Sequence, residues 1–287
     1  MSAITDESSE HWTEIIEPKT RLLDLRLNEL WRYRDLVLMF VRRDFVANYK
    51  QTILGPIWFF LQPLLTSLTY IFIFGKMAGL STDGLPMLVF YLAGITIWNY
   101  FSETLTKTAT VFKDNAQMFG KVYFPRLTMP FSIVVSNMVR FFIQFLLFIS
   151  IWAWYLAKTD TIHPNFYVLL TPILVIIMGL LALGLGMVIS ALTTKYKDLI
   201  FLLTFGVQLL MFATPVIYPV SSIPENYQWI IMANPMSSII ETFRYAFLGT
   251  GTFSWLQLGY SAAFSVIILL IGTIVFNRVE KSFTDTV

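Results

Sequence analysis

The sequence predicts an all-α integral membrane protein with six transmembrane helices, and three observations support this fold class. Hydrophobic residues make up 56% of the 287 positions, while charged residues make up only 13%. Soluble proteins carry roughly 25% charged residues, which they need to cover their surface. The apolar residues also gather in uncharged runs of about 18 residues or more, the length that a helix needs to cross a membrane. The composition therefore excludes a soluble enzyme, a disordered chain and a disulfide scaffold.

Residues 1–56 are expected to form a cytosolic N-terminal segment. This segment carries eight Lys and Arg residues and lacks the short basic start and apolar run of a secretory signal. Between residues 20 and 48, apolar residues at helical spacing lie beside a basic face, which is typical of an amphipathic helix on the inner leaflet. A soluble helix packed against a partner protein is the alternative.

Six spans are expected to follow in a transmembrane permease domain, residues 57–277, before a cytosolic tail, residues 278–287. The continuous apolar runs favour helices over barrel strands, whose alternating pattern repeats over about 10 residues. The predicted spans are about 57–75, 85–106, 127–157, 164–194, 199–219 and 253–276.

The distribution of basic residues predicts that both termini lie in the cytosol. Six is an even number of spans, so the two termini share one side. With the N-terminus inside, the inner segments hold 16 Lys and Arg residues, and the outer segments hold only Lys76, Lys158 and Arg244. Basic residues concentrate on the cytoplasmic side of membrane proteins, which gives this orientation.

The cytosolic loop Lys107–Arg126 is expected to contain a short amphipathic helix. Helical spacing places Phe112, Asn115, Phe119 and Val122 on one face. Such a face could dock a cytosolic protein, or the loop could simply connect two spans, and spacing alone leaves both interpretations open.

The external segment between residues 218 and 255 is expected to form a helical hairpin. It contains apolar stretches that are too short to cross the membrane, and Pro224 and Pro235 interrupt them. Short apolar pieces of this kind suit a re-entrant or interfacial position.

No catalytic, metal-binding or nucleotide-binding motif occurs in the sequence. The phosphate-binding loop G-x-x-x-x-G-K-[ST], the zinc motif H-E-x-x-H and the nucleophile motif G-x-S-x-G are all missing, and there is no cysteine. Arg140 is the only charge deep in a predicted span, and without a buried acidic relay it argues against proton-driven transport. We expect Arg140 to pair with Glu103.

Polar and aromatic residues form stripes along three predicted spans. In lipid, such faces must point at other helices or at water, so they indicate interhelical hydrogen bonds or, alternatively, a water-compatible conduit. The stripes contain Phe59, Gln62, Thr66, Thr69 and Tyr70 in span one, Ser132, Ser136, Arg140 and Gln144 in span three, and Thr204, Gln208, Met211, Pro215 and Tyr218 in span five.

Four motifs follow one another along the chain in a specific order. They are Tyr49-Lys50-Gln51-Thr52-Ile53-Leu54-Gly55-Pro56-Ile57-Trp58 with Gln62-Pro63, then Tyr196-Lys197-Asp198-Leu199, then Thr214-Pro215-Val216-Ile217-Tyr218-Pro219, and finally Asn234-Pro235-Met236 with Ile240-Glu241 and Arg244. Each motif is weak alone, but the ordered set resembles the permeases of polysaccharide ABC exporters. These permeases are type-2 ABC transporters that handle O-antigen, teichoic acid or capsule chains.

The resemblance implies a homodimer of permeases that works with two separate nucleotide-binding ATPase subunits. The ATPases would bind ATP and Mg²⁺, so this chain is expected to hold no cofactor and no metal and to be no enzyme itself. The amphipathic N-terminal helix resembles the interface helix of the family. The cytosolic loop resembles the coupling helix, with Phe112, Asn115, Phe119 and Val122 as ATPase-docking residues.

The external hairpin resembles the gate helices of these exporters. Glu241 and Arg244 stand three residues apart, so they could pair with each other or across the dimer. Spans one and five form the conduit in this family, which changes the interpretation of their stripes. The candidate conduit residues are Phe59, Gln62, Thr66, Tyr70, Gln208 and Tyr218.

The resemblance also implies a substrate and a location. A lipid-linked glycan like O-antigen would leave the cytosol across the bacterial inner membrane, as a step of lipopolysaccharide biosynthesis. The multi-pass chain would contact membrane lipid, and its net charge of +2 gives no sign of nucleic-acid binding. The alternatives are an ABC permease for drugs or small lipids and a membrane glycosyltransferase, although the latter needs buried acids or a metal pair.

Overall fold

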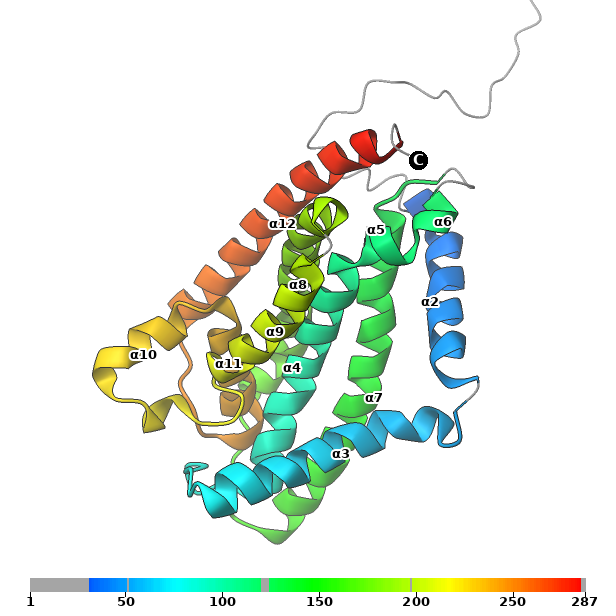
Figure 1. Ribbon diagram of the computed structural model, residues 1–287. Helices are drawn as coiled ribbons and strands as arrows, with labels where there is room; N and C mark the ends of the chain where they lie inside the picture. The colour runs from blue at the N-terminus through cyan, green and yellow to red at the C-terminus, as the bar shows by residue number, and fades with distance from the viewer. Residues whose placement is uncertain (1–30, 51, 120–123, 197, 285–287) are drawn as a thin grey trace, which may run out of the picture.

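The computed structural model describes residues 31–50, 52–119, 124–196 and 198–284, and within these ranges all regular structure is helical (Figure 1). The elements are α2 (Arg34–Tyr49), η1 (Gly55–Ile57), α3 (Trp58–Tyr70), η2 (Ile71–Met77), α4 (Met87–Ala109), α5 (Val111–Asp114), α6 (Ala116–Phe119), α7 (Thr128–Lys158), η3 (Phe166–Leu170), α8 (Thr171–Lys195), α9 (Leu199–Phe212), η4 (Val220–Ser222), α10 (Glu225–Met232), α11 (Pro235–Leu248) and α12 (Trp255–Thr284). Helix α2 covers part of the predicted amphipathic stretch, whose residues 20–30 lie outside the described ranges.

Four helical segments of the described chain are long and apolar enough to cross a membrane. They occupy the positions of the first, third, fourth and sixth predicted spans, and they are Gly55–Met77, Thr128–Lys158, Phe166–Lys195 and Trp255–Val279. The other two predicted spans correspond to α4 and α9, each of which differs from an ordinary spanning helix in its own way.

Helix α4 lies at the centre of the bundle and is more polar than α3, α7, α8 and α9. Sixteen of its 23 residues are buried, and it contacts α3, α7, α8, α9 and α11. It carries Asn99, Glu103 and Lys107 at four-residue spacing in its C-terminal half. Because other helices surround α4, it need not be as apolar as a helix that faces lipid.

Helix α9 is shorter than predicted. It ends at Phe212 rather than continuing to residue 219, and its 14 residues span about 21 Å, against roughly 30 Å of hydrocarbon. The reason is Pro215, which lacks the N–H that a continuing helix needs and which disfavours helical geometry in Thr214 before it. Residues 213–219 instead form a turn that is mostly buried.

Helices α8 and α12 make the closest backbone contact in the bundle's centre. A Cβ atom on Gly272 would lie 2.5 Å from the carbonyl oxygen of Gly184, and a Cβ on Gly184 would lie 2.6 Å from the Leu269 nitrogen. Small residues allow such close approach, which is how helices gain packing energy in membranes. Helices α4, α8, α11 and α12 therefore form a tightly packed group, which we call the central block.

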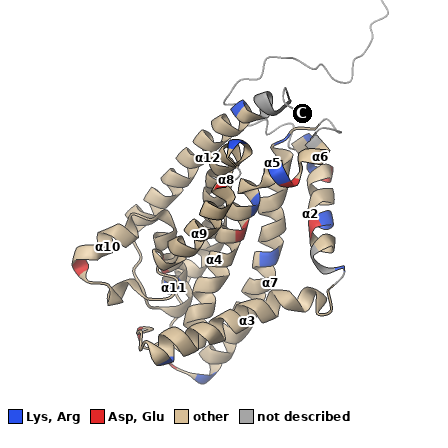
Figure 2. Cartoon of the chain, viewed as in Figure 1, with Lys and Arg blue, Asp and Glu red and all other residues tan. Residues whose placement is uncertain are grey.

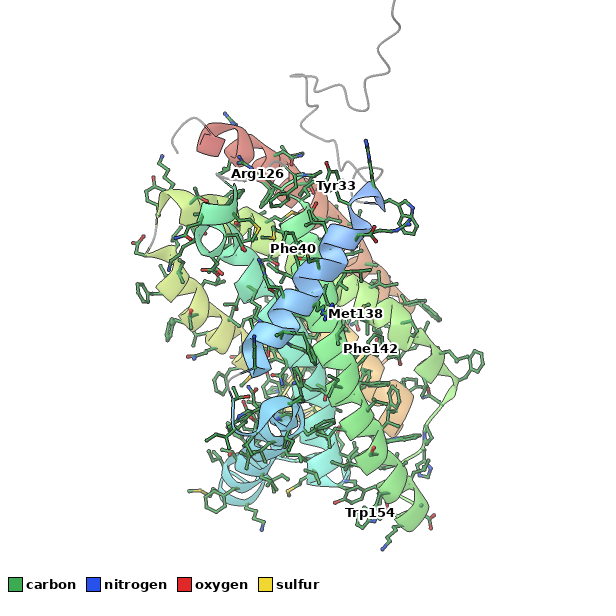
Figure 3. All side chains as sticks on the ribbon, turned by 90° about the vertical axis from the view of Figure 1, so that its right-hand side faces the viewer. Tyr33, Phe40, Arg126, Met138, Phe142 and Trp154 are labelled. Atoms are coloured by element: carbon green, nitrogen blue, oxygen red, sulfur yellow. The ribbon has the colours of Figure 1, made fainter. Side chains whose placement is uncertain are left out.

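Helices α2 and α3 lie outside this block. In Figure 1, α3 lies across α4 and α7 rather than along them, and Figure 3, turned by 90°, shows α3 nearly end-on. Helix α2 lies against α7, and Figure 3 labels Phe40 on α2 and Met138 and Phe142 on α7. The apolar window of the α3 segment is only 17% buried, so most of its surface has no neighbour within the chain.

Candidate functional site

The external hairpin consists of α10 and α11, joined at Asn234. The Asn234 side chain accepts a hydrogen bond from the Met236 N–H at 3.0 Å and donates one to Thr214 Oγ1 at 2.8 Å. Asn234 thus caps α11, and Pro235 occupies its first turn, where a missing N–H costs nothing. Gly249 ends the helix with a positive φ of 78°, which a glycine adopts without strain.

The two helices of this hairpin differ in burial. No residue of α10 is buried, and Trp229 is 70% exposed. In α11, 12 of 14 residues are buried against α12, α4, α8 and η3. Helix α11 therefore lies inside the bundle, whereas α10 lies on its surface.

Arg244 of α11 is buried, and its guanidinium faces backbone carbonyl groups and one aromatic ring. Its guanidinium donates to the carbonyl oxygens of Pro215, Val216 (2.6 Å) and Tyr218 (3.3 Å). Its Cζ lies 3.9 Å from the centre of the Phe90 ring of α4. A planar, permanently charged group with several donors suits this role, because it satisfies carbonyls that no helix satisfies.

Glu241 lies one turn before Arg244 and is equally buried. Its Oε1 is 3.6 Å from Arg244 Nη1, and its Oε2 accepts a hydrogen bond from the Thr252 N–H at 3.1 Å. Arg244 therefore holds the chain that leaves α9, and Glu241 holds the turn that leads into α12. Pairing within the chain is the geometry observed, so a contact across a dimer is not needed to satisfy these charges.

Burial shifts the pKa values of both members of this pair. It raises the pKa of the Glu241 carboxyl, an effect that Arg244 and the Thr252 N–H oppose. It lowers the pKa of Arg244 to about 10, while Glu241 acts in the opposite direction. The guanidinium therefore remains charged at neutral pH.

The predicted conduit residues of α3 and α9 lie on two helices that touch near Tyr70. The Tyr70 hydroxyl is 3.5 Å from Met211 Sδ of α9, and its ring meets the Tyr91 ring of α4 edge-on at 6.1 Å. Gln62 and Gln208 are exposed, and the Thr66 hydroxyl donates to the carbonyl of Gln62 in its own helix. Two amide side chains, one on each helix, are therefore exposed in the single chain.

Tyr218 and Phe59 have structural contacts that the sequence did not predict. The Tyr218 hydroxyl donates to the Phe212 carbonyl at 2.8 Å, which satisfies an end of α9. Phe59 is 5% exposed and stacks on Phe45 of α2 at 5.7 Å. In the single chain α2 covers the Phe59 ring, and its role as a conduit residue stays a prediction.

The predicted partner of Arg140 is confirmed. Arg140 Nη1 lies 2.6 Å from Glu103 Oε2, and Lys107 Nζ lies 3.6 Å from the same oxygen. Next to this cluster, the Asn99 amide donates to Gln144 Oε1 at 3.3 Å, between α4 and α7. The polar stripe of α7 thus pairs with polar groups of α4, as expected for interhelical hydrogen bonding.

The cytosolic loop is not one continuous amphipathic helix. Asn115 interrupts it between α5 and α6, and the Asn115 amide donates to the Val111 carbonyl at 3.0 Å. Phe112 is only 2% exposed and points inward, where it stacks on Phe276 of α12. The Phe112 side chain therefore does not share an exposed face with Asn115. Phe119 ends α6, but its side chain and all of Val122 lie outside the described residues.

Several functional contacts were missed because they join distant parts of the sequence. The carbonyl acceptors of Arg244, the Phe276 ring and the hydrogen bonds between Asp83 and Ser221 carry no local signal. Among the described residues, no group of three His, Cys, Asp or Glu side chains could hold a metal ion.

Comparisons with known proteins place this arrangement in a family. The chain is 28% identical over 263 residues to the O-antigen export system permease protein RfbA of Myxococcus xanthus, which covers 91% of this chain and 98% of that protein. It is 27% identical over 252 residues to RfbA of Klebsiella pneumoniae (88% and 94%), and 22% identical over 246 residues to the polysialic acid transport protein KpsM of Escherichia coli (84% and 92%). The ABC-2 type transporter family matches residues 35–248, more than half of the chain, and the chain therefore belongs to that family.

Proposed function

We propose that this chain is the membrane permease of an ABC exporter that moves a lipid-linked, O-antigen-like polysaccharide out of the cytosol across the bacterial inner membrane. The observation that carries this proposal is the match to O-antigen export permeases along nearly their whole length. A separate ATPase subunit binds ATP and Mg²⁺ and drives the transport, because the chain has no phosphate-binding loop.

The arrangement in the membrane completes this proposal. Four candidate spans, together with α4 and the segment from α9 to Tyr218, make six crossings. Figure 2 supports cytosolic termini, since Lys and Arg gather at the bundle end that contains α5, α6 and the end of α12. Lys113 and Lys195 belong to this end, and Lys76 and Lys158 to the other, in keeping with the distribution of basic residues in membrane proteins.

Two copies of the chain form the conduit in this proposal. Helices α3 and α9 bury few of their residues within one chain, and they carry Gln62, Tyr70 and Gln208. A second copy facing these helices would enclose a passage with aromatic rings, on which the CH faces of sugars stack, and amides, which bond their hydroxyls. Such contacts are weak and repeated, so that a long chain can slide.

Reconstitution tests the substrate. The permease and its ATPase are placed in proteoliposomes, and the appearance of a labelled lipid-linked glycan on the far side is measured with ATP and with a non-hydrolysable analogue. We expect glycan movement with ATP alone. Movement of drugs or small lipids instead would favour the alternative permease, and transport by this chain alone in a cation gradient would overturn the proposal.

A single substitution tests ATPase docking through the cytosolic loop. Phe119→Asp places a charge where the loop is proposed to meet the ATPase, and we expect less ATPase to co-purify with the permease. Gln117→Asp, on the same short helix but off the predicted face, is the control and should co-purify normally. Equal recovery of ATPase with both variants would remove Phe119 from the docking surface.

A further inference from the structure

We infer that α12 carries the motion of the cytosolic loop to the external hairpin, because it is anchored to the loop at one end and to the hairpin at the other. This inference rests on the proposed function, in which an ATPase moves the loop. It assigns positioning roles to Phe276 and Ser261, two buried residues on α12 that lie far apart along the helix.

The inner anchor is an aromatic stack. The rings of Phe112 on α5 and Phe276 on α12 are parallel to within 22°, with their centres 4.5 Å apart. Phe276 is fully buried and Phe112 is 2% exposed, so neither ring can move without its neighbour. The first turn of the cytosolic loop is therefore packed directly onto the inner end of α12.

The outer anchor is a set of hydrogen bonds to both helices of the hairpin. Ser261 Oγ is 2.6 Å from Ser238 Oγ of α11 and donates to the Pro235 carbonyl at 2.7 Å. The Tyr260 hydroxyl donates to the Ala233 carbonyl, at the end of α10, at 2.9 Å. The first turns of α12 are thus bonded to the junction between α10 and α11 rather than to one of these helices alone.

Between its two anchors, α12 touches α8 through glycine backbones. The Gly184 and Gly272 contact leaves no side chain interlocked at the closest point. Small residues let the two backbones approach closely, so α12 stays packed on α8 between its anchors. One continuous helix, closely packed on α8, thus joins the two anchors.

A second path from loop to hairpin exists and must be separated from the first. Helix α4 continues directly into α5, and its Phe90 contacts Arg244 of α11. If α4 carried the motion, the joints at Phe276 and Ser261 would only add stability. The ratio of glycan exported to ATP hydrolysed distinguishes the two paths, because a purely structural joint would not change that ratio.

The experiment weakens each anchor of α12 in the assembled complex with its ATPase. Phe276→Leu keeps an apolar side chain but loses the stack, and Ser261→Ala loses both bonds to α11. We expect each variant to retain ATPase binding and ATP hydrolysis while the export ratio falls several-fold. Ser265→Ala is the matched control, since this buried serine lies one turn along α12 and donates only to the Ser261 carbonyl of its own helix. It should keep the wild-type ratio.

A disulfide then tests the same joint in the opposite direction. The chain contains no cysteine, so Ser238→Cys with Ser261→Cys creates the sole pair, at positions whose Oγ atoms are 2.6 Å apart. The reduced variant lacks the Ser261 hydrogen bonds and should show the lowered export ratio, and if α11 and α12 move together, oxidation should restore that ratio. Export that stops on oxidation and returns on reduction would overturn the inference, as would an unchanged ratio in either Phe276→Leu or Ser261→Ala. A wild-type complex that moves no glycan at all would instead contradict the proposed function.

Discussion

Helices α11 and α9 have the same length and opposite environments. Both contain 14 residues, but 12 are buried in α11 and only Leu203 is buried in α9. Large apolar side chains of α9, including Phe201 at 80% exposed, have no cover within the chain. A monomeric soluble surface of this kind would aggregate, so the exposed sides of α9 must meet lipid, a second copy or both. The central block is complete in one chain, whereas the region around α3 and α9, which we call the open region, is not.

The same difference governs where charges lie. In the central block, Arg244 and Glu241 are almost fully buried, and the two Nη atoms of Arg244 and the Oε2 of Glu241 bond to backbone groups. Beside α3, the pair of Arg140 and Glu103 stays partly exposed, with side chains 14% and 33% accessible. A buried charge is stabilised only if several elements supply hydrogen-bond partners for it. A partly exposed charge is also stabilised by groups outside the chain. Mutations should therefore have larger effects on stability in the block than in the open region.

Arg244→Met should have the largest effect, because it leaves Glu241 as a buried charge without its partner. Breaking a buried pair in this way costs about 3–5 kcal/mol, and the Val216 and Tyr218 carbonyls also lose their donor. The free energy of unfolding of the purified permease, from thermal or denaturant melts, measures this loss. Glu241→Gln keeps a hydrogen-bonding side chain and should cost less. A loss below about 1 kcal/mol for Arg244→Met would contradict the importance of this clamp.

Adding one methyl group compares the packing of the two regions directly. Gly272→Ala would place a Cβ 2.5 Å from the Gly184 carbonyl, and we expect a loss of about 1–3 kcal/mol from overpacking. Gly206→Ala, in α9, meets nothing within 4 Å and should raise helix stability by up to about 1 kcal/mol. Melting temperatures of the two variants test this difference. If Gly206→Ala instead weakens self-association, the partner copy packs at this position.

The positions of most helices in the two regions could be predicted from the sequence, but the contacts between these helices could not. Long apolar runs gave the positions of α3, α7, α8 and α12 because spanning length follows from bilayer thickness. Uncharged runs do not register Pro215, so the predicted fifth span extended beyond the end of α9. Helical spacing brought Glu241 and Arg244 together, since three residues make nearly one turn, but it could not reveal acceptors on residues 215–218.

The cytosolic loop shows the same limit. Spacing placed Phe112 and Asn115 on one face, on the assumption of a regular helix. The helix breaks at Asn115, and the Phe112 ring turns inward because Phe276, 164 positions further on, offers a buried stacking partner. An amphipathic pattern identifies an apolar face but cannot tell a docking surface from a contact with the protein's own core.

The ion pair of Glu103 and Arg140 should make a moderate contribution. Both side chains retain contact with the surroundings, so we expect a coupling energy of about 1 kcal/mol from a double-mutant cycle. The cycle uses Glu103→Gln, Arg140→Gln and the double variant, with unfolding as the measurement. Lys107→Gln serves as the control, because Lys107 Nζ lies farther from Glu103, at 3.6 Å. A coupling energy as large as the loss in Arg244→Met would erase the distinction between the two regions.

Gln208→Leu should have the smallest effect on stability and a clear effect on transport. Gln208 is exposed on α9, so its replacement should change the free energy of unfolding by no more than about 0.5 kcal/mol. If the open sides of α3 and α9 line the passage, loss of this amide removes a hydrogen-bonding group for the glycan, and export at a fixed rate of ATP hydrolysis should fall.

Leu202→Gln is the reciprocal control, because it adds an amide at an exposed apolar position on the same helix. A passage-lining role requires that Gln208→Leu lower export with its stability unchanged. If export is unchanged while the chain melts earlier, Gln208 serves packing between copies, and the open region contributes an interface rather than a conduit at this position.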